Sequence, residues 1–351
     1  MRARALIDWP LGAMKLATGA KSFENNPWLS HPSLKRGDRG LHVRRALFAE
    51  RMADRRREQL THLVSAEHRA SFRRDGFVMV ENALPPEQFE RVREEAMGVH
   101  GDVREMRQGP TVTRRVTLDP VDRDVRPWSV AALQSPLLQG LVRYVASHNA
   151  RPLGYVQSII ATPPEGESDP QTSLHFDTFH SIAKSWLFLH DVGEEDGPFA
   201  YVPGSHRMTP ERCAWEQAQA EAITAHPDRM HRRGSFRVGP ADLEAMGLPA
   251  PRLMAVPANT LVVADTHGAH GRSPITTPTV RVELYASLRR SPFALLASAD
   301  LLAVTPAANR PAHTVLDALE FRDRIRRSVG SAKVHPWRPV SARRMDDPKA
   351  D

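Results

Sequence analysis

The chain has 351 residues, of which 41% are hydrophobic and 25% charged, a composition that allows one large domain with a full core. No run approaches the roughly 18 consecutive apolar residues that cross a bilayer. The first 20 residues are interrupted by Asp8, Pro10 and Lys15, so we expect neither a transmembrane helix nor a signal peptide. A single cysteine, Cys213, excludes an intrachain disulfide and a cysteine-based zinc cluster, and we expect a globular cytoplasmic protein.

The formal net charge of +7 is concentrated at the start of the chain. Residues 1–60 contain 13 Lys and Arg against 6 Asp and Glu, and the remainder is balanced. We expect residues 1–69 to form a basic, mostly helical extension, with helix over 41–67. This extension is interpreted as a solvated arm, or as an arm that attracts an anionic substrate or an anionic lipid surface. Nucleic acid is disfavoured because basic and aromatic residues are not interleaved at regular spacing.

The body of the chain begins with mixed elements and continues with strands. Residues 73–81 predict a turn that leads into a short strand, and Pro85-Pro86 opens a helix that runs to Met97. After a loop, residues 126–146 are mostly helical in pattern. Short strands separated by Gly and Pro then dominate, which is typical of a sandwich or small barrel. The expected strands are 154–161, 174–176, 185–189, 199–202, 260–264 and 280–288.

Residues 209–257 interrupt this series of strands. They predict a helix over 210–223, a basic loop over 226–234 and a short helix over 240–246. An insertion between site strands commonly forms a lid or a substrate wall, and a surface excursion without chemistry is the alternative. We expect the main domain to cover 70–330 and the polar tail, 331–351, to fray.

Three His-x-Asp triplets occur, and their local context separates them. Ligands at i and i+2 reach one metal only from extended backbone, because alternate side chains of a strand share a face. His100-Gly101-Asp102 follows a helix and indicates a turn, and His226-Pro227-Asp228 contains a proline that does not fit a strand ladder. His175-Phe176-Asp177 leads into the apolar run 186–189. We therefore interpret His175 and Asp177 as metal ligands.

His270 and Arg281 would complete a site for iron and a 2-oxo acid. Two imidazoles and one carboxylate leave three coordination positions open, which favours Fe(II). A 2-oxo acid occupies two of these positions and leaves the last for O₂. Its far carboxylate needs a fixed cation, and the planar fork of Arg281 suits that role if a hairpin through 273–278 returns it toward the metal. An ordinary strand arginine is the alternative for Arg281, and His267 competes with His270.

Five pieces of the chain follow one another in an order that identifies a family. They are residues 72–84, His175-Phe176-Asp177, residues 186–192, residues 196–206, and His270-Gly271-Arg272-Ser273-Pro274 with Arg281. Together these pieces, spread over about residues 70 to 290, resemble the phytanoyl-CoA dioxygenase family of iron(II)/2-oxoglutarate oxygenases.

The resemblance implies a fold, a cofactor set and residue roles. The fold is a mainly β double-stranded β-helix, or jelly roll, with flanking helices, and the cofactors are Fe(II), 2-oxoglutarate as co-substrate and O₂. His175, Asp177 and His270 are implied as iron ligands, and Arg281 as the partner of the far carboxylate of 2-oxoglutarate. The remaining implied co-substrate residues are Gln157, Thr172, Trp186 and Ser273. The sequence departs from the family at Arg272, where a serine is common.

The activity that the resemblance implies is hydroxylation of an aliphatic C–H bond in a small-molecule or lipid-like metabolite, with release of CO₂ and succinate. The carboxylate of Asp177 argues against the related halogenases, in which a small residue replaces this ligand. Two alternatives are kept: a non-catalytic jelly-roll binding protein, and an oxygenase that acts on an acyl-CoA or carrier-bound thioester at a membrane surface.

Overall fold

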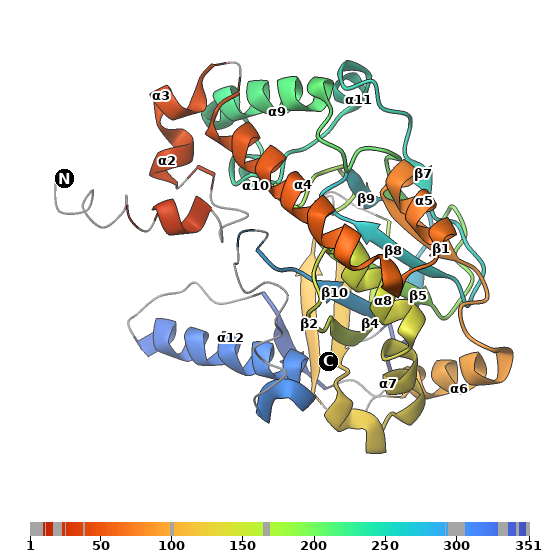
Figure 1. Ribbon diagram of the computed structural model, residues 1–351. Coiled ribbons are helices and arrows are strands. Elements are labelled where there is room, and N and C mark those ends of the chain that lie inside the picture. Colours follow the sequence, from red (N-terminus) through yellow and green to blue (C-terminus); the bar gives the residue numbers. More distant parts are fainter. Residues whose placement is uncertain are drawn as a thin grey trace.

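Two antiparallel sheets form the centre of the protein (Figure 1). The computed structural model describes residues 10, 12–16, 23–24, 26–37, 39–98, 102–163, 169–291, 293, 306–328, 336–341 and 344–348. In these ranges the large sheet has eight strands in the order β1-β8-β5-β10-β4-β3-β2-β11, and the small sheet has three in the order β7-β6-β9.

The strands of the large sheet are β1 (Phe77–Val80), β2 (Val103–Gln108), β3 (Thr111–Thr117), β4 (Leu153–Ala161), β5 (Ala183–Phe188), β8 (Leu261–Asp265), β10 (Thr279–Leu288) and β11 (Arg338–Val340). The strands of the small sheet are β6 (Phe199–Tyr201), β7 (Arg252–Leu253) and β9 (His270–Arg272).

The order in which the chain visits the two sheets defines the jelly roll. It passes from β4 to an isolated bridge at His175 beside β9, then to β5, to β6 and β7, to β8, to β9 and finally to β10. The chain therefore crosses between the sheets repeatedly, and strands far apart in sequence become neighbours. The predicted double-stranded β-helix is confirmed.

The two faces of the large sheet have different contents, because successive side chains of a strand point to opposite sides. The outward face of β5, β8 and β10 carries aliphatic side chains such as Leu187, Val263 and Leu284, which belong to the largest hydrophobic cluster. The inward face carries aromatic, polar and charged side chains, among them Trp186, Gln157 and Arg281. Stability and chemistry are thus assigned to opposite faces of one sheet.

Helices cover the outward face. Its hydrophobic cluster contains residues of α5 (Ala66–Asp75), α6 (Pro86–Met97), α7 (Pro127–Leu133) and α8 (Pro136–Val145). The long helix α4 (Leu41–Gln59) crosses the front of Figure 1 and packs against α9 (Pro210–Ala222). The buried His42 Nε2 lies 2.8 Å from Glu216 Oε2 in this contact.

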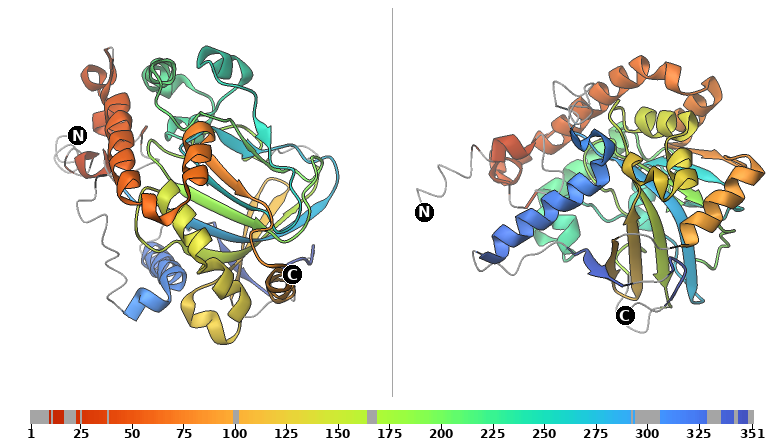
Figure 2. Two further views of the ribbon diagram at one scale, coloured as in Figure 1. Left: turned by 45° about the vertical axis from the view of Figure 1, so that its right-hand side comes forward. Right: turned by 90° about the horizontal axis from the view of Figure 1, so that it is seen from below.

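On the other side of the large sheet lies α12 (Pro311–Ser328) (Figure 2). Its His313 Nε2 lies 2.8 Å from the Thr117 hydroxyl of β3, and it contacts β4. The remaining helices are short: α2 (Pro27–Ser30), α3 (Pro32–Lys35), α10 (Arg229–Arg232), α11 (Pro240–Ala245), η1 (Thr61–Leu63), η2 (Pro120–Asp124), η3 (Ile223–Ala225) and η5 (Pro306–Asn309).

Most predicted elements lie within a residue or two of the observed ones. The helix opened by Pro85-Pro86 runs to Met97 as expected, and the turn before β1 is made by Gly76, which caps α5 with φ 85°. The loop expected before residue 126 is wrong, because β2 and β3 form a hairpin there. Polar residues interrupt the apolar positions of both strands, so neither contains the apolar run that indicates a strand.

The prediction that residues 331–351 fray is also wrong for the part that the structure describes. β11 pairs with β2, and Met345 is fully buried. The Ser158 hydroxyl of β4 donates a hydrogen bond of 2.5 Å to the carbonyl of Met345. A polar, Pro-containing composition therefore did not prevent this tail from joining the sheet.

Candidate active site

The backbone beside β9 brings His175, Asp177 and His270 together. The His175 N–H donates to the His270 carbonyl at 2.8 Å, and the His270 N–H returns a bond of 3.1 Å to the His175 carbonyl. The Asp177 N–H donates to the Thr266 carbonyl at 3.1 Å. Residues 174–176 are not a continuous strand as predicted, because His175 makes only isolated bridges, to His270 and Arg237.

The ligand atoms of the three residues lie within 4.8 Å of one another. His175 Nε2 is 3.8 Å from Asp177 Oδ1, and His270 Nε2 is 3.7 Å from Asp177 Oδ2. Two ligands that each bind a metal at about 2.1 Å are separated by between about 3 and 4.2 Å, depending on the angle at the metal. The observed spacing suits one ion held on one side by three protein atoms.

Hydrogen bonds to backbone carbonyls orient both histidines. His175 Nδ1 lies 2.8 Å from the Ser173 carbonyl, and His270 Nδ1 lies 2.9 Å from the Gly268 carbonyl. A carbonyl only accepts, so each Nδ1 carries the hydrogen and each Nε2 presents a lone pair to the site. Burial lowers the pKa of His175 to about 4, and burial followed by the charge of His175 lowers the pKa of His270 well below its usual value. Both imidazoles are therefore neutral near pH 7.

Lys184 is a site residue that the sequence analysis missed. Its ammonium lies 2.5 Å from Asp177 Oδ2, and it stands on the inward face of β5, two residues before Trp186. Strand alternation from Trp186 could have placed it there. The pair balances the charge of the carboxylate in this largely buried site.

Arg281 stands on the inward face of β10, at the end where the hairpin from β9 returns. Its side chain is buried, one Nη donates to the Gly197 carbonyl at 2.8 Å, and its Nε has no hydrogen-bond partner among the described residues. Burial lowers its pKa. Glu283 lies two residues along the same face and is also buried, and burial raises the pKa of its carboxyl.

Gln157 and Trp186 share the inward face with Arg281. Gln157 Nε2 donates to Glu283 Oε1 at 2.5 Å, and Trp186 is paired in register with Tyr285. The Trp186 ring lies 4.4 Å from that of Phe199, which in turn lies 5.9 Å from the His270 ring. These aromatic rings form a continuous wall between β10 and the triad.

Thr172 and Ser273 occupy the edge of the site in different ways. The Thr172 hydroxyl donates to the Asp169 carbonyl at 2.7 Å, inside its own loop. The Ser273 hydroxyl is buried without a hydrogen-bond partner among the described residues. Arg272, the departure from the family pattern, is paired with Asp169 at 2.7 Å, and burial lowers its pKa to about 10.

The competing histidine and the other triplets have different surroundings. His267 is not part of the triad; its Nδ1 lies 3.0 Å from the Thr178 carbonyl. Asp228 caps α10 by accepting from the His231 N–H, and His226 stacks on His231 with ring centroids 3.5 Å apart. His100 and Gly101 lie outside the described residues.

The expected insertion borders the triad. The Phe176 N–H donates to the Phe236 carbonyl at 3.0 Å, and the Val238 N–H donates to the Leu174 carbonyl at 2.9 Å. Residues 236–238 thus lie beside the His175 segment. The predicted range of 209–257 also contains β7, which belongs to the small sheet.

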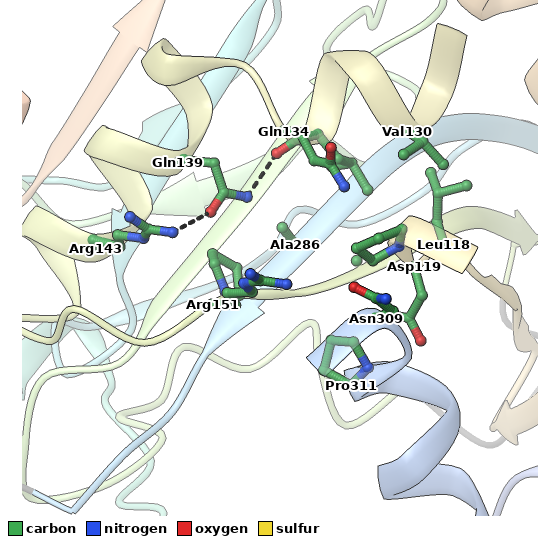
Figure 3. A pocket seen from close by; sticks show the side chains of 14 residues that line it. Leu118, Asp119, Val130, Gln134, Gln139, Arg143, Arg151, Ala286, Asn309 and Pro311 are labelled. Carbon is green, nitrogen blue, oxygen red and sulfur yellow. Dashed lines mark hydrogen bonds between the residues drawn. The ribbon is translucent and has the colours of Figure 1, made fainter. Parts of the chain in front are cut away.

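A large pocket lies away from this site (Figure 3). Its volume is about 390 Å³, and its lining includes Gln139, Arg143, Arg151 and Ala286. Ala286 belongs to the outward face of β10, whereas its neighbour Tyr285 belongs to the inward cluster. No member of the triad lines this pocket. It therefore lies on the other side of the large sheet from the candidate active site.

Known proteins resemble parts of this chain. Residues 72–245 match the family model "Phytanoyl-CoA dioxygenase (PhyH)", and the chain belongs to this family. The match includes His175 and Asp177 and ends before His270 and Arg281. Ectoine dioxygenases of Bordetella parapertussis and Bordetella bronchiseptica are each 30% identical in an alignment of 162 positions that covers 41% of this chain. The chain spans about half (50%) of the length of these relatives.

Solved structures show a weaker similarity. The 2-oxoglutarate-dependent epimerase SnoN from nogalamycin biosynthesis is 20% identical, with a TM-score of 0.44 over 66% of this chain and 87% of its own. HygX from Streptomyces hygroscopicus, with nickel, 2-oxoglutarate and hygromycin B bound, is 18% identical, with a TM-score of 0.37 over 64% and 86%. At these TM-scores the similarity does not bear on the function.

Among the helices in the described ranges, none combines the length and the apolar character that crossing a bilayer requires.

Proposed function

We propose that this protein is an Fe(II)- and 2-oxoglutarate-dependent dioxygenase that hydroxylates an aliphatic C–H bond of a small molecule. The observation that carries the proposal is the triad of His175, Asp177 and His270, whose nitrogen and oxygen atoms converge on one point. Family membership supports the same reading.

The triad fits the metal in three respects. The donor set of two imidazoles and one carboxylate is the one that non-haem Fe(II) oxygenases use. Both histidines are neutral and oriented by backbone carbonyls, which is how proteins position metal-binding imidazoles. The Nε2 of His270 is buried and has no hydrogen-bond partner among the described residues, a cost that a bound metal would remove.

The chain's own residues divide the remaining work. Bound iron and 2-oxoglutarate would supply oxidation of the substrate by O₂, with release of CO₂ and succinate. Arg281 would bind the far carboxylate of 2-oxoglutarate, because it is buried and its Nε is unpaired. Gln157 and Trp186 would line the co-substrate pocket, with Thr172 and Ser273 at its edge. Residues 236–238 would form a wall beside His175, which gives the insertion a role.

We propose residues 1–69 as an extension, 70–330 as the oxygenase domain and 331–351 as a tail that completes the sheet. Part of the extension's positive charge is buried, since Arg57 lies 3.1 Å from Asp265 and Arg45 is packed over Phe179. A structural role for α4 therefore accounts for some of the basic residues. The name of the ectoine dioxygenases supports a small-molecule substrate, and the free, buried Cys213 suits the cytoplasm.

Anaerobic addition of Fe(II) and 2-oxoglutarate tests the proposed site. Chelation of the metal by the 2-oxo acid should produce a weak visible charge-transfer band in the wild type. Asp177→Ala should lose the band while keeping a cooperative thermal transition. Asp102→Ala is the matched control, because it removes the aspartate of another triplet, whose side chain is exposed. A wild type without the band, or an unchanged band in Asp177→Ala, would contradict the proposal.

Turnover separates an enzyme from a binding protein. With O₂ present and no other substrate, the wild type should convert 2-oxoglutarate slowly to succinate above an iron-only control. A protein that shows the band but forms no succinate with any candidate substrate would be a binder that has kept the metal site.

A further inference from the structure

The two largest side chains that are fully buried among the described residues are arginines, Arg114 of β3 and Arg212 of α9. Arg114 serves the sheet, because its Nε pairs with Glu105 at 2.8 Å and one Nη donates to two carbonyls of the C-terminal segment. Arg212 instead lies against the segments that carry the metal ligands. A buried charge costs stability unless its partners satisfy it, and all three nitrogens of Arg212 have such partners.

Arg212 holds both ends of the turn that precedes His270. One Nη donates to the His267 carbonyl at 3.0 Å. The other Nη donates to the Ser205 carbonyl, and the Ser205 hydroxyl accepts the Ala269 N–H at 2.8 Å. The turn between these two contacts includes the carbonyl that accepts from His270 Nδ1. The guanidinium therefore fixes the backbone that orients the His270 ring.

The flat face of the same guanidinium serves the other two ligands. Its carbon lies 4.1 Å from the centroid of the Phe176 ring, and Phe176 stands between His175 and Asp177 in the chain. An aromatic face attracts a cation, so this contact holds the ring and the guanidinium together. Arg212 thus contacts both backbone segments of the triad, the turn before His270 and the segment from His175 to Asp177.

Helices α9 and α4 hold the guanidinium in place. Arg212 Nε donates to Glu216 Oε1 at 2.9 Å, one turn further along α9. Glu216 Oε2 lies 2.8 Å from His42 Nε2 of α4, and the imidazole donates in this contact because a carboxylate only accepts. All three side chains are buried. The contacts from His42 through Glu216 to Arg212 therefore connect the N-terminal extension to the backbone of the metal site.

We propose that Arg212 is a positioning residue for the metal site, and that α4 contributes to the site through His42 and Glu216. This inference rests on the proposed function and gives the extension and the insertion a shared part in it. A functional site requires its groups to be held to within about 0.5 Å of the productive geometry. The three ligands come from two separate backbone segments, and one guanidinium in contact with both limits their relative movement.

The affinity and the coordination geometry of bound Co(II) test this role in the full-length protein. Anaerobic titration gives the affinity, and the visible d–d absorption of Co(II) reports the geometry. Arg212→Met should alter the spectrum and weaken Co(II) binding about 10–100-fold, as loss of a group that orients metal ligands does. Arg212→Lys should lie between Arg212→Met and the wild type, because an ammonium keeps the charge but lacks the planar fork.

Arg114→Met is the matched control. It removes the other fully buried arginine, together with an ion pair and two hydrogen bonds to carbonyls, at a place that does not contact the triad. It should lower the thermal stability, as Arg212→Met does. It should also bind Co(II) as tightly as the wild type, with the same spectrum. The comparison separates the loss of positioning from a general loss of stability.

Two further variants apply if Arg212→Met does not fold because Glu216 is left buried without its cation. The double variant Arg212→Met/Glu216→Met removes both charges, an exchange that is often neutral for stability. It should show the same weakened binding and altered spectrum. His42→Leu removes the donor on α4 and should weaken Co(II) binding less than Arg212→Met does, because the pair of Arg212 and Glu216 remains.

Each outcome decides a different point. If Arg212→Met and the double variant bind Co(II) with the affinity and spectrum of Arg114→Met, the inference is overturned, because Arg212 would then stabilise the fold alone. Wild-type affinity in His42→Leu overturns the part assigned to α4. A wild type that binds no Co(II), or whose spectrum persists in Asp177→Ala, overturns the proposed function itself.

Discussion

The two faces of the large sheet are made from the same strands, but one stabilises the fold and the other carries the candidate active site. On β10, the outward side chains of Val282, Leu284 and Ala286 are buried among aliphatic residues of the covering helices. The inward side chains of Arg281, Glu283 and Tyr285 alternate with them. One face buries apolar area, which stabilises the fold, and the other buries charge, which costs stability unless something binds it.

The difference shows where function is located in this molecule. Unpaired polar atoms at Arg281 and Glu283, and at His270 across the barrel, all belong to the inward side. Natural proteins keep few such groups, and these three surround the place where the metal and the co-substrate would bind. Substitutions on the outward face should therefore change the stability of the fold, whereas substitutions on the inward face should change the binding of metal and co-substrate.

The largest effect on metal affinity is expected from replacing His270. His270→Ala should weaken Mn(II) or Fe(II) binding about a thousandfold, because it removes one of three protein ligands. His267→Ala, three residues earlier, should change metal affinity less than threefold. Anaerobic calorimetric titration measures both. The reverse result would move the metal site to His267.

A cavity on the outward face should affect stability alone. Leu284 is completely buried, and Leu284→Ala should lower the free energy of unfolding by about 2–5 kcal/mol. Urea unfolding of the metal-free protein measures this change, and Leu253→Ala on the exposed β7 is the control. Metal affinity of the folded variant should remain that of the wild type; a large loss would show that the two faces are not independent.

Replacing the cation beside Asp177 should have a smaller effect of opposite sign on metal binding. The Lys184 ammonium lies where it would repel a divalent ion, so Lys184→Met should tighten Mn(II) binding about tenfold. It should also destabilise the metal-free protein, because Asp177 loses its partner. Lys184→Arg keeps the charge and should resemble the wild type. Weaker metal binding in Lys184→Met would mean instead that Lys184 orients Asp177.

Buried histidines near the site should make the metal-free protein sensitive to acid. Burial lowers the pKa of His180 to about 4 and that of His267 to about 3, below the ordinary value of 6.5. Between pH 6.5 and about 4 the unfolded state binds protons that the folded state does not, so stability falls as the pH falls. Each histidine contributes up to about 1.4 kcal/mol per pH unit. Urea unfolding at pH 7, 6 and 5 should show that His180→Asn reduces the slope by about one histidine's share; an unchanged slope would exclude His180.

Local sequence signals were sufficient for part of this picture. Proline at the start placed α6 correctly, and the turn signals before residue 280 placed the strand that carries Arg281. The His175 triplet was separated from two others by its position before an apolar strand. These signals act over a few residues, so they can be read without knowing which strands pair.

Other features depended on partners far away in sequence. β2 and β3 carry polar residues and form strands because each has a neighbour on both sides in the sheet. Strand alternation could place Lys184 on the inward face, but its contact with Asp177 depends on how β5 packs beside the His175 segment. Met345 is buried because the C-terminal segment packs beside β4, although its polar composition predicted a frayed tail.

The sequence by itself determined the chemistry on offer: two histidines, one carboxylate and one arginine at spacings that suit iron and a 2-oxo acid. Only the tertiary structure decided which groups meet. It set Lys184 against Asp177, enclosed Arg212 between α9 and the ligand segments and separated His267 from His270. The physical reason is that spacing along a chain fixes direction over a few residues, whereas contacts between strands depend on how the whole sheet buries its apolar face.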